Sequence, residues 1–293
     1  MQKRKETIAG LLFASPWFVG FTVFLAYPLC ASIYYSFCDY TVLKPPVWVG
    51  LNNYIDLFRD EVFYITLINT FQYAVIALPL GMVVAIALAL LLNTKVRGMA
   101  FYRTIFFLPS LVPMVALAVL WLWMFNGEHG LINMALRGFG VAGPNWLGDP
   151  QWSKPALIML SVWGVGNAIV IYLAGLQDIP THLYEAADLD GASPWQKVKA
   201  VTLPMLSPVI QFNMILGIIG TLQVFTVPYV MFGVGGPPAR STYFYTMYLY
   251  DNAFRFQKMG YACAMGWIMF LIIFALTLIS IKVSEKRIHY GTN

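Results

Sequence analysis

Neutral side chains in two apolar segments are the groups of this chain best suited to bind a solute. Trp163 and Asn167 stand four residues apart, and Thr226 and Tyr229 stand three apart, so a helix would bring each pair to one face. Aromatic faces bind the CH surfaces of sugars, and neutral polar side chains bind their hydroxyl groups. As a group these residues favour a neutral polyol or oligosaccharide, and the candidates are Trp163, Asn167, Tyr172, Gln223, Thr226 and Tyr229.

Any one of these residues alone is better explained by helix packing, because Asn and Gln hydrogen-bond across helices inside membranes. The same segments carry no positive charge, which argues mildly against an anionic solute such as a phosphorylated glycerol. That argument is mild because a second subunit sharing the pathway could supply the charge.

A second group of residues, acidic and small, lies in the long polar stretch 177–204. Thr181 is a candidate N-cap for a helix that ends at Leu189, and Asp190-Gly191 is typical of a sharp turn in which glycine adopts a positive φ. Ser193-Pro194-Trp195-Gln196 predicts a capping box with proline at the first helical position. The stretch therefore predicts two short helices joined by a bend.

This bent segment could dock into a partner protein or float on lipid headgroups. Pro204 is expected to end its second helix where the next apolar segment begins. The first helix carries Glu185 and Asp188, whereas helices that lie on lipid favour Lys and Arg. A compact acidic helix with the small residues Ala186 and Ala187 suits a groove on a partner. The pattern favours docking.

Motifs for an internal energy source or for catalysis are absent from the sequence. The central parts of the apolar segments contain no Asp, Glu, Lys, Arg or His, which argues against a proton relay. The chain has no GxxxxGK phosphate loop, no HExxH and no GxSxG motif, and Cys30, Cys38 and Cys263 lack zinc-site or CxxC spacing. No cofactor is expected, and uphill transport would need a separate ATPase.

The composition indicates that lipid is the solvent. Of 293 residues, 59% are hydrophobic and 11% are charged, whereas soluble domains carry about 25% charged residues. A helix needs about 20 apolar residues to cross the bilayer core. Six segments qualify, which predicts an all-α membrane protein with six transmembrane helices: Ile8–Tyr35, Phe71–Leu92, Ile105–Phe125, Ala156–Leu176, Val209–Phe232 and Tyr261–Ile281.

Local features refine these spans. The first apolar run is too long for the core of a signal peptide and is expected to remain as an anchor. Prolines are expected to kink or end helices at Pro16, Pro28, Pro79, Pro109, Pro113 and Pro228. The net charge of +5 does not indicate nucleic acid, because the basic residues flank the spans.

Lys and Arg placement orients the spans. With six spans both termini share one side, and that side holds the denser basic set: Lys3, Arg4, Lys5, Lys95, Arg97, Arg103, Lys197, Lys199, Lys282, Lys286 and Arg287. The positive-inside rule therefore predicts cytoplasmic termini and a cytoplasmic 177–204 stretch. Residues 1–66 would form an N-terminal span with an extracytoplasmic segment, including an interfacial helix around Tyr54–Phe58, and 67–293 a five-helix core.

At this point the sequence resembles the binding-protein-dependent ABC importer permeases. Glu185-Ala186-Ala187, Asp190-Gly191-Ala192, Trp195 and Leu203-Pro204 are similar to the EAA loop of that family. An ordered set of motifs along the chain resembles the carbohydrate-type subgroup of that family: Gly50-Leu51-Asn52-Asn53-Tyr54, Asn69-Thr70, Tyr102-Arg103-Thr104, Phe107-Leu108-Pro109, Gly130-Leu131-Ile132-Asn133, Trp146-Leu147, Ala174-Gly175-Leu176-Gln177-Asp178-Ile179-Pro180 and Gly235-Gly236-Pro237.

The resemblance implies a type I ABC importer permease in a bacterial inner membrane. Such a permease pairs with a second homologous permease, binds one of two copies of a cytoplasmic ATPase and receives solute from an extracytoplasmic binding protein. The residues it implies for ATPase coupling are Glu185, Ala186, Ala187, Asp190, Gly191 and Ala192. Gly191 would permit the bend, Ala186 a close approach, and Glu185 polar contacts that orient the loop.

One departure from the family pattern concerns the stretch after the fifth span. The family usually has Thr just before the Gly-Gly-Pro element, whereas here Phe232-Gly233-Val234 intervenes and the stretch is one residue longer. The alternatives are a permease for glycerol phosphate or another non-sugar solute, or a passive polyol channel. A passive channel would have no need of the long inner loop. A membrane enzyme would need clustered catalytic residues, and the sequence has none.

Overall fold

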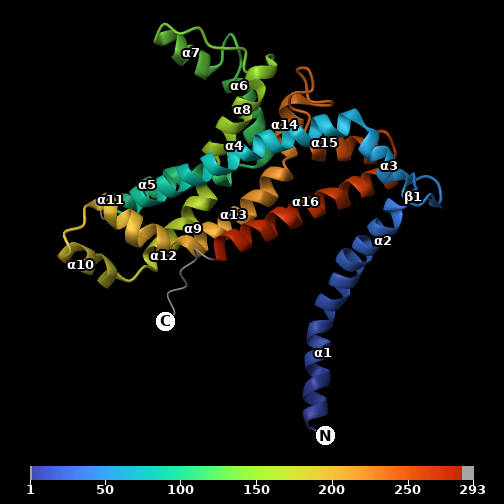
Figure 1. Ribbon diagram of the computed structural model, residues 1–293, viewed down its shortest axis with the longest axis horizontal. Coiled ribbons are helices and arrows are strands. Elements are labelled where there is room, and N and C mark those ends of the chain that lie inside the picture. Colours follow the sequence, from blue (N-terminus) through green and yellow to red (C-terminus); the bar gives the residue numbers. More distant parts are fainter. Residues whose placement is uncertain (1, 95, 286–293) are drawn as a thin grey trace. The chain divides into compact units, whose positions relative to one another are not determined.

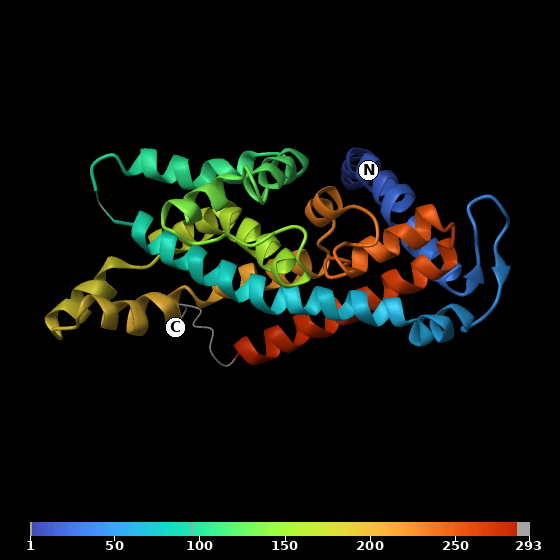
Figure 2. The same ribbon diagram turned by 90° about the horizontal axis from the view of Figure 1, so that it is seen from above.

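The structure is a computed structural model that describes residues 2–94 and 96–285 (Figures 1 and 2). Lys95, Lys286 and Arg287, which contributed to the predicted orientation, lie outside the described residues. The chain divides into two compact units, one of Met1–Glu61 with Leu249–Leu271 and the other of Val62–Tyr248 with Ile272–Asn293.

The first unit begins with α1 (Gln2–Phe21), a π-helical turn (Thr22–Ala26) and α2 (Tyr27–Ser36). A short antiparallel hairpin follows, of β1 (Cys38–Asp39) and β2 (Val47–Trp48), and then α3 (Asn52–Arg59). The Asn53 side chain fixes α3 to the hairpin, because its amide donates to the carbonyls of Ser36 and Cys38 at 2.9 Å each. The predicted short helix around Tyr54–Phe58 is therefore present.

The second unit contains most of the helices. In chain order they are α4 (Glu61–Leu92), α5 (Met99–Phe107), α6 (Met114–Met124), α7 (Leu131–Gly138), α8 (Pro150–Trp163), α9 (Gly166–Gln177), α10 (Thr181–Leu189), α11 (Pro194–Lys197), α12 (Leu203–Met205), α13 (Ser207–Leu222) and α14 (Thr226–Phe232). Besides α4, whose first residue belongs to the first unit, α15 (Tyr245–Tyr250) and α16 (Met259–Glu285) are divided between the two units.

Four helical stretches of the described chain are long and apolar enough to cross a membrane, and two bent pairs raise the number to six if each pair is one span. The four single stretches are Gly10–Ser36, Glu61–Leu92, Ser207–Phe232 and Met259–Glu285. The pair α5 and α6 bends by 98° and the pair α8 and α9 by 43°. The chain is thus a multi-pass helical membrane protein.

Prolines lie at the sharpest bend between helices. Pro109 and Pro113 lie between α5 and α6, and a 3₁₀ turn at Leu108–Leu111 joins the two helices, as the loss of backbone donors predicts. Pro79, in contrast, lies inside α4 without ending it. The helix also begins at Glu61 rather than at Phe71, because polar residues of its first turns are buried and hydrogen-bonded.

Two hydrophobic clusters pack the second unit. The first is centred on Trp121, Phe125, Trp146 and Phe244, and joins α6, α8 and α14. The second is centred on Ala85, Ala89 and Tyr172, and joins the end of α4 to α9 and to the start of α13. Arg103 closes the end of α4 by donating from Nη2 to the Leu92 carbonyl at 2.9 Å, which satisfies a terminal carbonyl.

Candidate functional site

A cavity of about 330 Å³ lies where the broken helices of the second unit meet. It is bounded by α4, α6, α8 and α9, the end of α13, and α14. Its polar lining is wholly neutral: Tyr73, Ser110, Ser161, Asn167, Gln223 and Thr226. Helix breaks generate this site, since Gly164 and the stretch Gln223–Phe225 leave side chains and backbone open to the cavity.

Three of the sequence-predicted solute residues meet in this cavity. Asn167, Gln223 and Thr226 all line it. Trp163 instead lines a neighbouring apolar cavity of about 380 Å³, where its ring meets that of Trp121 edge-on at 5.8 Å. The expected shared face with Asn167 is lost because the chain bends by 43° between the two residues.

Two further solute candidates lie in the protein interior. Tyr229 stacks on Phe225 with ring centroids 5.0 Å apart, and packs beside the first hydrophobic cluster. Tyr172 is fully buried in the second cluster. Sequence reasoning missed Tyr73, Ser110 and Ser161. The signal for Ser110 is its position beside Pro109, because a polar residue at a helix break faces a gap in the packing.

The stretch 177–204 forms the predicted hairpin of two short helices, at one end of the second unit (Figures 1 and 2). Helix α10 ends in a Schellman motif in which the Ala192 N–H donates to the Ala187 carbonyl at 2.9 Å and the Gly191 N–H to the Asp188 carbonyl at 3.1 Å. Gly191 has φ of +73°, a conformation that other residues adopt at a cost.

The start of α11 follows the predicted capping box. The Ser193 hydroxyl accepts from the Gln196 N–H, and the Gln196 side chain accepts from the Ser193 N–H at 2.7 Å. Two other expectations need correction. Pro180, not Thr181, is the N-cap residue of α10. Pro204 does not end the second helix, because it lies at the first turn of α12 after a π-helical turn at Val198–Thr202, where its missing N–H is tolerated.

Side-chain contacts fix the hairpin to the membrane helices. Asp188 on α10 pairs with Lys197 on α11, and the Tyr184 hydroxyl lies 3.0 Å from the Thr202 hydroxyl. Leu183 and Tyr184 pack against the second hydrophobic cluster, which contains residues of α9 and Leu206. The hairpin is therefore packed against the cluster that joins α9 to the start of α13.

The outer surface of the hairpin carries the predicted coupling residues. Glu185, Ala186, Asp190 and Gly191 are exposed, and Ala187 and Ala192 are half-buried. Two large apolar side chains accompany them: Leu189 is 91% exposed and Trp195 is 71% exposed. An exposed Trp and an exposed Leu in one short hairpin have the composition of an interface anchor.

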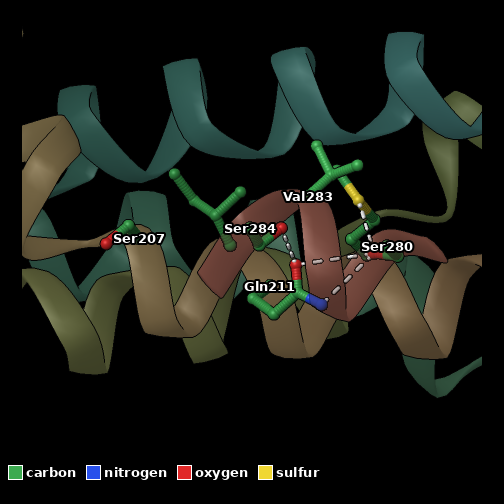
Figure 3. A pocket seen from close by; sticks show the side chains of 7 residues that line it. Ser207, Gln211, Ser280, Val283 and Ser284 are labelled. Carbon is green, nitrogen blue, oxygen red and sulfur yellow. Dashed lines mark hydrogen bonds between the residues drawn. The ribbon is translucent and has the colours of Figure 1, made fainter. Parts of the chain in front are cut away.

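A polar cluster lies where α13 leaves the hairpin (Figure 3). The Gln211 amide nitrogen donates to the Ser280 hydroxyl at 3.2 Å, and the Ser284 hydroxyl donates to the Gln211 carbonyl oxygen. Gln211 and Ser280 are each only 8% exposed. This cluster joins α13 to the end of α16, so the helix that follows the hairpin is fixed to the last span.

Among the described residues no group of three or more His, Cys, Asp or Glu side chains could hold a metal ion. The candidate site thus comprises a neutral cavity and the exposed hairpin of α10 and α11. Together with the apolar bundle, these features define a membrane transport subunit.

The chain belongs to the family described as the binding-protein-dependent transport system inner membrane component, whose family model matches residues 57–290, and it is a carbohydrate-type permease of a type I importer. It is 39% identical to the probable ABC transporter permease protein YesP of Bacillus subtilis (strain 168), over 98% of this chain and 94% of the relative.

Other relatives agree with this assignment. The chain is 35% identical to the lactose transport system permease protein LacF of Rhizobium radiobacter, over 97% of each chain. Among solved structures it is similar to a chain of a bacterial alginate ABC transporter in complex with an alginate pentasaccharide-bound periplasmic protein, with a TM-score of 0.84 and 25% identity over 97% of this chain and 96% of that one. The chain is thus a transporter subunit and not an enzyme.

Proposed function

We propose that this chain forms half of the translocation pathway for a neutral sugar, oligosaccharide or related polyol, and that the hairpin of α10 and α11 couples it to a cytoplasmic ATPase. In this proposal it pairs with a second homologous permease as a heterodimer, with two copies of the ATPase and an extracytoplasmic binding protein. The chain crosses the bacterial inner membrane six times, with both termini cytoplasmic. Residues 1–66 are the N-terminal span and extracytoplasmic segment, and 67–293 the five-helix core.

The observation that carries the coupling role is the exposed, preformed bend at Gly191. A hairpin held by a Schellman motif, a capping box and an ion pair loses little conformational entropy on docking, which favours affinity. Leu189 and Trp195 supply the apolar anchors, and Glu185 the polar contact that orients the hairpin. The small side chain of Ala186 lets the partner approach closely. Ala187, Asp190 and Ala192 complete the docking surface.

Retention of the ATPase tests this role. In the detergent-solubilised complex, Trp195→Ala should lower the amount of ATPase that co-purifies with the tagged chain by about tenfold or more, as expected when an interface anchor is truncated. Phe139→Ala is the matched control, because Phe139 is also an aromatic residue and is 87% exposed, at the end of α7. Equal retention in the two variants would contradict the docking role.

The neutral cavity supports an uncharged solute. Asn167, Gln223 and Thr226 offer amide and hydroxyl groups to sugar hydroxyls, and the cavity lining contains no Lys, Arg or His to bind a phosphate. Trp163 and Tyr229 remain candidates for the pathway from positions beside this cavity. A named relative fits a sugar, since LacF is a lactose transport system permease protein.

The solute is identified by measuring which compound the binding protein of this permease binds. The thermal stability of the binding protein should rise in the presence of at least one neutral sugar from a panel of lactose, trehalose, maltose and arabino-oligosaccharides, because a ligand stabilises the form that binds it. Glycerol phosphate and alginate oligosaccharides are the anionic controls. A shift with an anionic compound and with none of the neutral sugars would overturn the choice of solute, while leaving the permease assignment in place.

A further inference from the structure

The loop between α14 and α15 has an unusually constrained backbone. Gly233, Gly235 and Gly236 all have positive φ values, of +69°, +72° and +57°. A Cβ added to Gly236 would lie 2.1 Å from the Tyr243 nitrogen, so only glycine fits there. The loop also closes on itself, because the Thr242 hydroxyl donates to the Pro237 carbonyl at 2.8 Å. We call residues 233–244 the glycine loop.

Two adjacent residues of α4 are bonded to the glycine loop and to Tyr245, the residue of α15 that directly follows it. The Asn69 amide donates to the carbonyls of Arg240 at 2.7 Å and of Tyr243 at 3.1 Å. The Thr70 hydroxyl accepts from the Tyr245 N–H at 2.9 Å and donates to the Thr66 carbonyl at 2.8 Å. Asn69 is 6% exposed and Thr70 is fully buried. Breaking these hydrogen bonds therefore costs free energy, because water does not reach the buried groups to replace them.

A third contact comes from α8. The hydroxyl groups of Ser153 and Ser241 lie 2.8 Å apart, and Ser153 is fully buried. Two helices that bound the 330 Å³ cavity, α4 and α8, are thus attached to the same loop.

The contacts lie one helical turn from the cavity. Tyr73, one turn after Asn69, lines the cavity, and so does Leu157, one turn after Ser153. Phe244 at the end of the glycine loop meets the Tyr73 ring edge-on at 5.4 Å. The loop therefore lies over the end of the cavity remote from the hairpin of α10 and α11.

We propose that Asn69 and Thr70 are positioning residues that hold the glycine loop as a fixed rim over the extracytoplasmic end of the cavity, where the sugar-loaded binding protein delivers its cargo. The proposal rests on the function and orientation proposed above. A fixed rim presents one geometry to the binding protein, so its docking does not first have to order the loop. Released from Asn69 and Thr70, the loop would sample other conformations and productive docking would weaken.

Trypsin cleavage at Arg240 reports the order of the loop directly. Arg240 is exposed, and a protease cuts there only when the loop opens. In the assembled complex Asn69→Leu, which keeps the size and loses both donors, should raise the rate of cleavage between Arg240 and Ser241 by about tenfold. Thr70→Val should do the same, whereas Thr70→Ser, which keeps the hydroxyl, should be cleaved at the rate of the unaltered complex.

A second readout separates positioning from general destabilisation. Asn69→Leu should raise the concentration of sugar-loaded binding protein that half-saturates ATP hydrolysis by about fivefold or more, with basal ATP hydrolysis and its maximal rate unchanged. The sugar is the one that stabilises the binding protein in the panel above. If Asn69→Leu and Thr70→Val leave both the cleavage rate and the half-saturating concentration unchanged, the proposal is wrong.

Loss of assembly in both variants would also overturn the proposal, since the network would then be required for folding and not for positioning. The proposed function is tested separately by the unaltered complex, in which sugar-loaded binding protein must stimulate ATP hydrolysis. Absence of that stimulation would reject the proposed function, and the cleavage rates at Arg240 would still report whether Asn69 and Thr70 order the loop.

Discussion

A substitution series at Gly191 tests the hairpin by its backbone alone. Gly191 has φ of +73°, and a Cβ added there would meet no atom within 4 Å, so the cost of a side chain is conformational and not steric. Alanine in this left-handed conformation costs about 1–2 kcal/mol, whereas asparagine tolerates it better. Proline cannot adopt it and also removes the N–H that donates to Asp188, a total of about 3 kcal/mol or more.

ATP-dependent sugar uptake should therefore fall in the order glycine, asparagine, alanine, proline. We expect a small loss for Gly191→Asn, a several-fold loss for Gly191→Ala, and uptake reduced by about two orders of magnitude for Gly191→Pro, since each 1.4 kcal/mol is a factor of ten. Gly191→Asp should also abolish coupling, because it adds a carboxylate beside Asp190. Uptake is measured in proteoliposomes with the ATPase, the partner permease and the binding protein, and membrane levels of each variant are the control.

The reasoning fails if Gly191→Pro imports sugar at the rate of the unaltered protein. It also fails if Gly191→Asn is as defective as Gly191→Pro at equal membrane levels, because the loss would then follow from any side chain and not from φ. Gly98, which has φ of +84° and no atom within 4 Å of an added Cβ, supplies the matched position: Gly98→Asn and Gly98→Ala test the backbone cost away from the hairpin.

Five further substitutions, at four positions, follow from the capping box, the buried Tyr172 hydroxyl and the cavity lining. Ser193→Ala removes the acceptor for the Gln196 N–H and should cost the hairpin about 1 kcal/mol, lowering uptake several-fold, while Ser193→Asp should keep it. Tyr172→Phe removes a buried hydroxyl that has no hydrogen-bond partner among the described residues, so the melting temperature should stay the same or rise, and a clear fall would contradict the packing. Asn167→Leu and Gln223→Leu should raise the half-saturating sugar concentration with membrane levels unchanged; an unchanged value in both would remove the cavity from the pathway.

Local sequence signals predicted the hairpin well. The capping box of Ser193 and Gln196 and the positive φ of Gly191 depend on residues within one turn of each other, so the pattern contains the whole cause. Pro109 and Pro113 predicted a break for the same reason. The prediction that Pro204 ends the helix was wrong because a π-helical turn directly before it accommodates the missing N–H. No local sequence pattern predicts that turn.

Distant contacts explain what the sequence could not predict. The second span was expected to begin at Phe71, whereas α4 begins at Glu61 and contains the polar residues Thr66 and Asn69. The Asn69 amide donates to the Arg240 carbonyl, 171 positions away, and a window on the sequence cannot contain such a partner. The pairing of Trp163 with Asn167 assumed one straight helix, and the 43° bend between them sends Trp163 to another cavity.

The most direct test of the account is the dependence of sugar accumulation on each component in proteoliposomes. The chain with its partner permease, the ATPase and sugar-loaded binding protein should hydrolyse ATP and accumulate sugar against its gradient. The chain alone should do neither, because it forms only half of the pathway and relies on the ATPase held by the hairpin. Accumulation of sugar by the chain alone would contradict the account.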